Sequence, residues 1–118
     1  MKIFSLTFLL LINISVLNNA YAETPSSEID HLIAYVARSN CDFIRNGSSH
    51  PSSEAVEHMQ NKYKYFRKKI KTAEQFIEMS ASKSTLSGKP YWIKCPDRKE
   101  VPSQAWLLEE LSRYRQNK

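Results

Sequence analysis

The sequence predicts a mainly helical fold at the edge of the α+β class, with about four helices and two short strands joined by one disulfide. Apolar residues recur at helical spacing in four segments, and two short runs have the aromatic and β-branched composition typical of strands. Each run contains one of the two cysteines, Cys41 and Cys95. If these cysteines are bonded, the strands become neighbours and can pair, which places a minimal two-stranded element among the helices.

The first predicted helix begins with Thr24 as its N-cap and Pro25 in the first helical position, and it ends near Asn40. Its apolar face is formed by Ile29, Leu32, Ile33, Val36 and Ala37. His31 lies off this face, so we expect it to be exposed to solvent.

The first strand is predicted over residues 41–44, followed by the turn Arg45-Asn46-Gly47, because Asn and Gly accept positive φ at low cost. Residues 48–53 are predicted as a loop. The next helix is expected to be the longest, with Phe66 buried between the first and last helices. Its apolar residues, spaced by three and four, are Val56, Met59, Tyr63, Phe66 and Ile70.

The third helix is predicted from Thr72 and Gln75, which have the spacing of a capping box. A serine-rich loop follows over residues 80–88, and the second strand is predicted over residues 91–95. A polar connection then leads to Ser103, which is expected to cap the last helix. The apolar side of that helix is formed by Trp106, Leu107, Leu108, Leu111 and Tyr114.

The N-terminus has the organisation of a secretory signal peptide. A positively charged start precedes an apolar run over residues 3–17, and Ala20-Tyr21-Ala22 has the small-x-small pattern of a cleavage site. The run is shorter than the roughly 20 residues that span a bilayer, which argues against the alternative of a retained membrane anchor. We expect a signal peptide over residues 1–22, cleavage after Ala22, and a single periplasmic domain over residues 23–118 without a membrane span.

The two cysteines favour a disulfide, because an even number of cysteines in an exported chain is usually bridged. Cys41 and Cys95 are 54 positions apart, and chain entropy gives such a bridge a stabilisation of about 4 kcal/mol. Two buried thiols are the alternative. The chain has no Cys-x-x-Cys motif, so a redox catalyst is not expected. No cofactor and no metal site is predicted.

The chain is basic. Its formal net charge is +5, and the loss of Lys2 with the signal peptide lowers the charge to +4. Nucleic acid is not an expected partner outside the cytosol, whereas weak contact with anionic surfaces is. Six basic residues between Lys62 and Lys71 could hold anionic lipid or polymer. A solvated helix face is the favoured interpretation of the same residues.

Glu54, His58 and Lys62 follow one another at intervals of four and should line one side of the second helix. A carboxylate that orients an imidazole is the outline of a general base. An ordinary ladder of polar surface residues has the same spacing, and the pattern alone favours the ladder.

Four groups of short motifs carry a family resemblance. They are Phe43-Ile44-Arg45-Asn46-Gly47; Glu54-Ala55 with His58 and Lys62; Thr72-Ala73-Glu74-Gln75-Phe76-Ile77; and Ser87-Gly88-Lys89-Pro90-Tyr91 with Ser82 and Ser84. Together they resemble the YfeK family of small periplasmic bacterial proteins, a domain of unknown function, over most of residues 28–115. The resemblance implies the location and the fold, and cysteines matching Cys41 and Cys95 are common in the family. It implies no established activity, substrate or cofactor.

The resemblance also points to polar residues that packing does not require, namely Arg45, Asn46, Glu54, His58, Lys62, Ser82, Ser84 and Tyr91. We expect the Asn-Gly turn to bring Arg45 within salt-bridge reach of Glu54.

The expected function is that of a small non-enzymatic binding or interaction module for an unknown envelope ligand or protein. The binding residues would be Arg45, Asn46, His58, Lys62, Ser82 and Tyr91. The alternative is a small hydrolase or transferase that acts on an envelope component. In that enzyme His58 would be the base, Glu54 would orient it, Arg45 and Lys62 would hold an anion, and Ser84 would be the nucleophile. A third possibility is an inhibitor or immunity protein that meets another protein through the basic helix.

Overall fold

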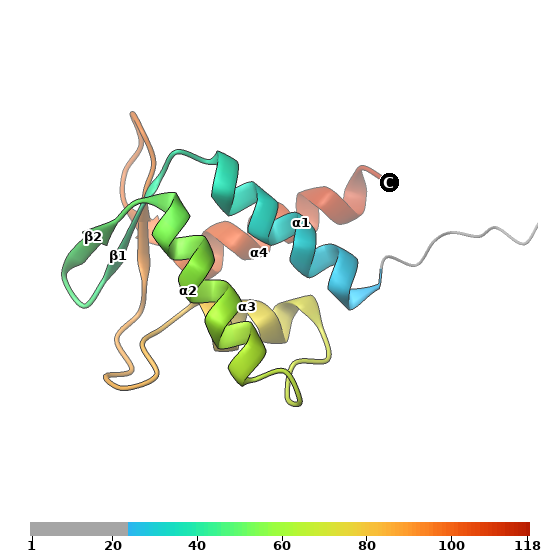
Figure 1. The fold of residues 1–118 in the computed structure, drawn as a ribbon. Helices are drawn as coiled ribbons and strands as arrows, with labels where there is room; N and C mark the ends of the chain where they lie inside the picture. The colour runs from blue at the N-terminus through green and yellow to red at the C-terminus, as the bar shows by residue number, and fades with distance from the viewer. Residues whose placement is uncertain (1–23) are drawn as a thin grey trace, which may run out of the picture.

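The computed structural model describes residues 24–118, so the predicted signal peptide and its cleavage after Ala22 lie outside the described residues. Within this range, four helices lie beside a small antiparallel sheet (Figure 1). The elements in chain order are α1 (Pro25–Arg38), β1 (Asp42–Arg45), β2 (Ser48–His50), α2 (Ser52–Tyr65), α3 (Ala73–Ala81), β3 (Trp92–Lys94), β4 (Val101–Pro102) and α4 (Ser103–Gln116). This architecture confirms the predicted mainly helical α+β class. None of the described helices is long and apolar enough to cross a bilayer.

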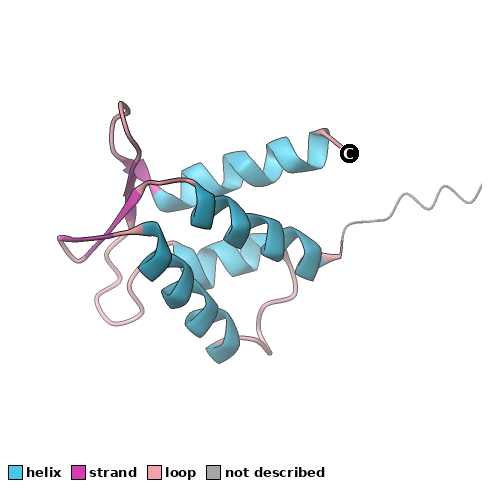
Figure 2. Cartoon of the chain, turned by 45° about the horizontal axis from the view of Figure 1, so that its top comes forward, coloured by secondary structure: helices cyan, strands magenta, loops and turns pink. Residues whose placement is uncertain are grey.

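The sheet lies at one end of the helices and has the strand order β2-β1-β3-β4, with antiparallel neighbours throughout (Figure 2). Its central pair joins β1 to β3, with Phe43 opposite Ile93. Both side chains are fully buried, so this pair belongs to the core. The expected pairing of the two predicted strands is therefore confirmed.

Two strands of the sheet were not predicted. Asn46 and Gly47 have φ of 49° and 80°, which is the geometry of a two-residue hairpin turn whose twist matches the flanking strands. The chain therefore continues directly into β2, although residues 48–53 were predicted as a loop. Likewise, the connection predicted as irregular after the second strand contains β4, in which Val101 pairs with Ile93. Neither β2 nor β4 has the composition of a strand. Both form because a neighbouring strand pairs with them.

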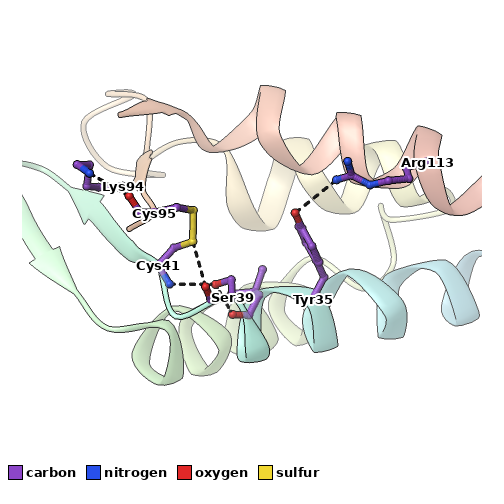
Figure 3. The surroundings of a disulfide bond; sticks show 7 residues. Tyr35, Ser39, Cys41, Lys94, Cys95 and Arg113 are labelled. Carbon is purple, nitrogen blue, oxygen red and sulfur yellow. Dashed lines mark hydrogen bonds between the residues drawn. A yellow bond between two sulfur atoms is a disulfide. The ribbon is translucent and has the colours of Figure 1, made fainter. Parts of the chain in front are cut away.

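A disulfide joins Cys41 to Cys95 beside the central strand pair (Figure 3). The two Cα atoms are 4.2 Å apart, just under the common range of about 4.4 to 6.8 Å. The end of α1 positions Cys41. The Ser39 hydroxyl donates to the Val36 carbonyl at 2.7 Å and accepts the Cys41 N–H at 3.2 Å. Asn40 between them has the left-handed φ of 55° that commonly follows a helix end.

The core is centred on α3, which packs against α1, α2 and α4. The Thr72 hydroxyl caps α3 by accepting the Gln75 N–H at 3.1 Å, as predicted. The Gln75 side chain accepts the N–H of Lys71 at 2.6 Å, one residue before the cap. The fully buried apolar side chains around α3 are Ile29, Leu32, Val36, Phe43, Phe76, Ile77, Ile93, Leu107 and Leu111.

The second helix is shorter than predicted and is not the longest, since α1, α2 and α4 have 14 residues each. It ends at Tyr65, and Phe66 is its C-cap. The chain then turns over residues 66–69, and Thr72 takes an extended conformation as the N-cap of α3. Ile70 is buried from within this turn, whereas Phe66 is only partly buried. The prediction that Phe66 is buried between the first and last helices is therefore wrong.

Two polar side chains have roles other than those predicted. Ser103 is fully buried in the first position of α4, and its hydroxyl donates to the Ala81 carbonyl at 2.8 Å, so it joins α4 to α3 and does not cap its own helix. His31 is half-buried, with Nε2 2.7 Å from a carboxylate oxygen of Glu110 and its ring stacked on Tyr114 at 3.8 Å. It therefore joins α1 to α4, contrary to the expected exposure.

Truncation of the two phenylalanines should separate core from periphery. Phe76 is fully buried and Phe66 is not, so Phe76→Ala should lower the free energy of unfolding by about 3 to 5 kcal/mol, and Phe66→Ala should lower it by less. Urea unfolding of both variants with the disulfide intact measures the difference. A larger loss for Phe66→Ala would contradict the described packing.

Removal of the disulfide should destabilise the protein strongly. The double variant Cys41→Ser, Cys95→Ser should lose up to about 4 kcal/mol, because the unfolded chain regains the entropy of an open loop. Urea unfolding compares it with the oxidised protein. A count of free thiols on the exported wild-type protein should find none, and two reactive thiols would refute the bridge.

Candidate functional site

The candidate site lies where α2 faces the sheet, around the phenol of Tyr91. Tyr91 is buried, and its backbone is fixed by two hydrogen bonds: its N–H donates to the Ser82 carbonyl at 2.8 Å, and its carbonyl accepts the Ser103 N–H at 2.9 Å. The tyrosine is therefore held by the segments before β3 and at the start of α4. This attachment gives the site a rigid base.

His58 and Lys62, one turn apart on α2, both contact Tyr91. His58 Nε2 lies 3.0 Å from the Tyr91 hydroxyl, and the two rings meet edge to face at 5.7 Å between centroids. Lys62 Nζ lies 5.3 Å from the centroid of the Tyr91 ring and donates to the Lys83 carbonyl at 2.9 Å. The interval of four predicted in the sequence therefore directs these two side chains to one tyrosine.

Arg45 is brought to the same place by strand pairing. In the β1–β3 register, Ile44 lies opposite Trp92, and one further step places Arg45 opposite Tyr91. The positive charge of Arg45 acts on His58, Lys62 and Tyr91. Arg45 Nε is buried and has no hydrogen-bond partner among residues 24–118. We call Arg45, His58, Lys62 and Tyr91 the Tyr91 cluster.

The electrostatics of the Tyr91 cluster are dominated by burial and by like charges. Burial lowers the pKa of His58 to about 4, and the positive charges of its neighbours act in the same direction. Burial also lowers the pKa of Lys62, with further contributions from Arg45 and Lys83. The pKa of Tyr91 is raised by burial, and the nearby Arg45 opposes that rise. At neutral pH the cluster therefore holds a neutral imidazole and a neutral phenol.

Glu54 is placed outside the Tyr91 cluster. One of its carboxylate oxygens lies 2.9 Å from Nδ1 of His50, and the side chain is largely exposed. Within residues 24–118, no ion pair joins it to Arg45 and no hydrogen bond joins it to His58. The expected contact between Arg45 and Glu54 is therefore not formed. The β1–β2 hairpin brings His50 next to the first turn of α2, where the imidazole of His50 pairs with the carboxylate of Glu54 instead.

The remaining predicted residues shape the loop before β3. The Ser82 hydroxyl donates to the Ile77 carbonyl at 2.5 Å, and the Ser84 hydroxyl accepts the Ser87 N–H at 3.2 Å. The Ser87 hydroxyl donates to the side-chain oxygen of Asn46 at 2.8 Å, which ties this loop to the hairpin turn. In the described part of the chain, no hydrogen bond joins His58 to a serine.

A hollow of about 300 Å³ adjoins the Tyr91 cluster, with Lys62 in the wall of both. Its other lining residues are Phe66, Glu78, Met79, Lys83, Ser84, Thr85 and Gly88. The sequence did not point to Lys83, because its contribution is a backbone carbonyl that any residue would supply. It did not point to Phe66 either, because its apolar spacing suggested the core. Residues 24–118 contain no group of three or more His, Cys, Asp and Glu side chains arranged to hold a metal ion.

The fold defines a class: a small, mainly helical α+β protein with one disulfide. Residues 23–115 match the family of unknown function DUF5329. The chain therefore belongs to the DUF5329 family, and the predicted likeness to YfeK-like proteins of unknown function is confirmed.

One curated relative supports this assignment. The chain is 45% identical over 60 residues to the uncharacterised protein YfeK of Salmonella typhimurium, an alignment that covers 51% of this chain and 50% of the relative. The chain thus spans about half the length of the curated relative it matches. No solved structure is significantly similar to the chain.

Acidification should destabilise the protein partly through His58. Its pKa is about 4 in the folded protein, against the ordinary 6.5, so the unfolded chain binds more protons between these values and the folded protein loses stability as the pH falls through them. His58→Gln cannot take up this proton and should lose less free energy of unfolding between about pH 7 and pH 5, as measured by urea unfolding.

Protonation of the carboxylates does not affect this comparison between the wild type and His58→Gln. Hydrogen bonds and charges from their partners lower the pKa values of Glu28, Glu74 and Glu110 below the ordinary 4.5, so their contribution is lost at lower pH. Equal losses in the wild type and in His58→Gln would show that His58 is not held neutral by burial.

Proposed function

We propose that this protein is a non-enzymatic binding module that holds an anionic group at the Tyr91 cluster. The observation that carries the proposal is the convergence of three basic side chains on one buried tyrosine without a carboxylate among them. A phosphate, sulfate or carboxylate group fits this chemistry, because each accepts several hydrogen bonds from planar guanidinium, ammonium and hydroxyl donors.

Without a bound anion, the cluster costs stability. Like charges held close together in a partly buried place repel one another, and this repulsion contributes to the lowered pKa values of His58 and Lys62. A buried donor without a partner, such as Arg45 Nε, carries a further penalty. A bound anion would relieve both costs, since it would attract the cations and accept the free N–H.

The same geometry supports binding over the hydrolase or transferase alternative. A general base works best with a pKa near the working pH and with a nucleophile within hydrogen-bond reach. The pKa of His58 is about 4, and the hydrogen bond of its Nε2 atom is to Tyr91. The hydroxyl of Ser84 is engaged with its own loop, and Glu54 is engaged with His50.

We infer that binding takes place outside the cytoplasm, in the periplasm. The disulfide suits an oxidising compartment. The family match starts at residue 23, directly after the predicted cleavage site. The ligand would then be an envelope component that carries an anionic group.

Titration with sulfate tests the site, because sulfate stays fully ionised across the pH range of interest. Binding measured by calorimetry or by NMR shifts at Tyr91 should weaken at least about tenfold in Arg45→Gln and in Lys62→Gln, since each variant removes a charge-assisted hydrogen bond. Arg98→Gln is the matched control: this exposed residue lies in the β3–β4 connection, and its loss should leave binding unchanged. Equal weakening in all three variants would show that binding depends only on the net charge of the protein.

The affinity for sulfate should also depend on pH. A bound anion raises the pKa of His58 above its free value of about 4, so binding takes up a proton and the affinity should increase as the pH falls from about 7 to 5. In His58→Gln the affinity should be flat across this range while Arg45 and Lys62 still bind. An unchanged slope in that variant would place the anion away from His58.

A further inference from the structure

Two exposed apolar side chains lie outside the Tyr91 cluster, each in a basic neighbourhood. Tyr65, at the end of α2, is 81% exposed, and Leu86, in the loop between α3 and β3, is 100% exposed. Single exposed apolar residues are common on proteins. Here the two most exposed large apolar side chains of the described chain both lie among basic residues.

The two segments lie on one side of the molecule. Both the turn after α2 and the loop before β3 project from the lower edge in Figure 1, and they keep this placement in Figure 2. Phe66 from the first segment and Thr85 from the second line the same hollow of about 300 Å³. Tyr65 and Leu86, each next to one of these lining residues, therefore flank a single surface.

This surface carries unpaired positive charge. Its basic residues are Lys64, Arg67, Lys68 and Lys69, which line a hollow with Tyr65 and Phe66, and Lys83, which lines the hollow shared by Phe66 and Thr85; all five are exposed. In residues 24–118, none of them forms an ion pair within 4.0 Å of a carboxylate. Their charge is thus available to an outside partner. We call these five residues with Tyr65 and Leu86 the basic face.

We propose that the basic face binds the surface of a bilayer that contains anionic phospholipids, with Tyr65 and Leu86 entering the interfacial layer. Lysine and arginine attract anionic headgroups, and tyrosine is favoured at the membrane–water interface. A soluble polyanion would use the cations alone and would give no role to the exposed Leu86. The two apolar side chains therefore favour a lipid surface. The basic face contains no residue of the Tyr91 cluster, although Lys62 lines the hollow beside it, so the vesicle test does not depend on the proposed anion site.

Cosedimentation with vesicles tests the proposal on the exported protein with its disulfide intact. Vesicles of phosphatidylcholine with phosphatidylglycerol should bind the protein, and vesicles of phosphatidylcholine alone should not. Lys68→Gln with Lys69→Gln should weaken binding about tenfold, since each basic residue near an anionic surface contributes. The charge-matched control, Arg98→Gln with Lys99→Gln on the β3–β4 connection, should change binding less than about twofold.

The apolar residues distinguish a lipid surface from a polyanion. Tyr65→Ser with Leu86→Ser should weaken vesicle binding by several-fold while binding to dextran sulfate stays unchanged, because a polymer offers no apolar layer to enter. The high exposure of both side chains keeps these changes away from the core. The proposal is overturned if phosphatidylglycerol vesicles do not bind, or if this variant binds them like the wild type, which would indicate a polyanion surface.

Discussion

The antiparallel pairing of β1 with β3, closed by the Cys41–Cys95 bridge, is the constraint on which the rest of the structure depends. It joins the half of the chain that contains α1 and α2 to the half that contains α3 and α4. The antiparallel register places the cysteines at one end of the strand pair and brings Arg45 opposite Tyr91 at the other end. One pairing therefore sets both the covalent link and the base of the candidate site.

The charges of the molecule are distributed unevenly around this frame. At the far end of α4, Arg115 holds Glu28 at 2.6 Å and Glu74 at 2.8 Å, which joins α4 to α1 and α3. These paired charges stabilise the helical packing, because each donor finds an acceptor. Around Tyr91 the described basic groups find no carboxylate, and burial lowers the pKa values of Lys62 and His58. Ion pairs thus support the fold, whereas the basic groups of the Tyr91 cluster are left for the anion that we propose.

The helix α2 connects the two proposed surfaces. Its first half begins at the β1–β2 hairpin and carries His58 to Tyr91. Lys62 borders both the Tyr91 cluster and the hollow, and the helix ends at Tyr65 on the basic face. One 14-residue helix would therefore contact both the anion held by the cluster and the bilayer bound by the basic face. If both proposals hold, this arrangement would keep a bound anionic envelope component close to the bilayer surface.

The sequence by itself determined the helices and the turn at Asn46-Gly47, because helical spacing, caps and turn residues act locally. It also predicted the disulfide, from the even number of cysteines in a chain with an export signal. It also singled out Arg45, His58, Lys62 and Tyr91 by their resemblance to a family, without showing that they meet. Only the tertiary structure decided that β2 and β4 form, that Glu54 pairs with His50, and that Phe66 leaves the core. These outcomes depend on contacts between segments distant in sequence. A strand such as Ser48–His50 has no strand composition and exists because β1 lies beside it.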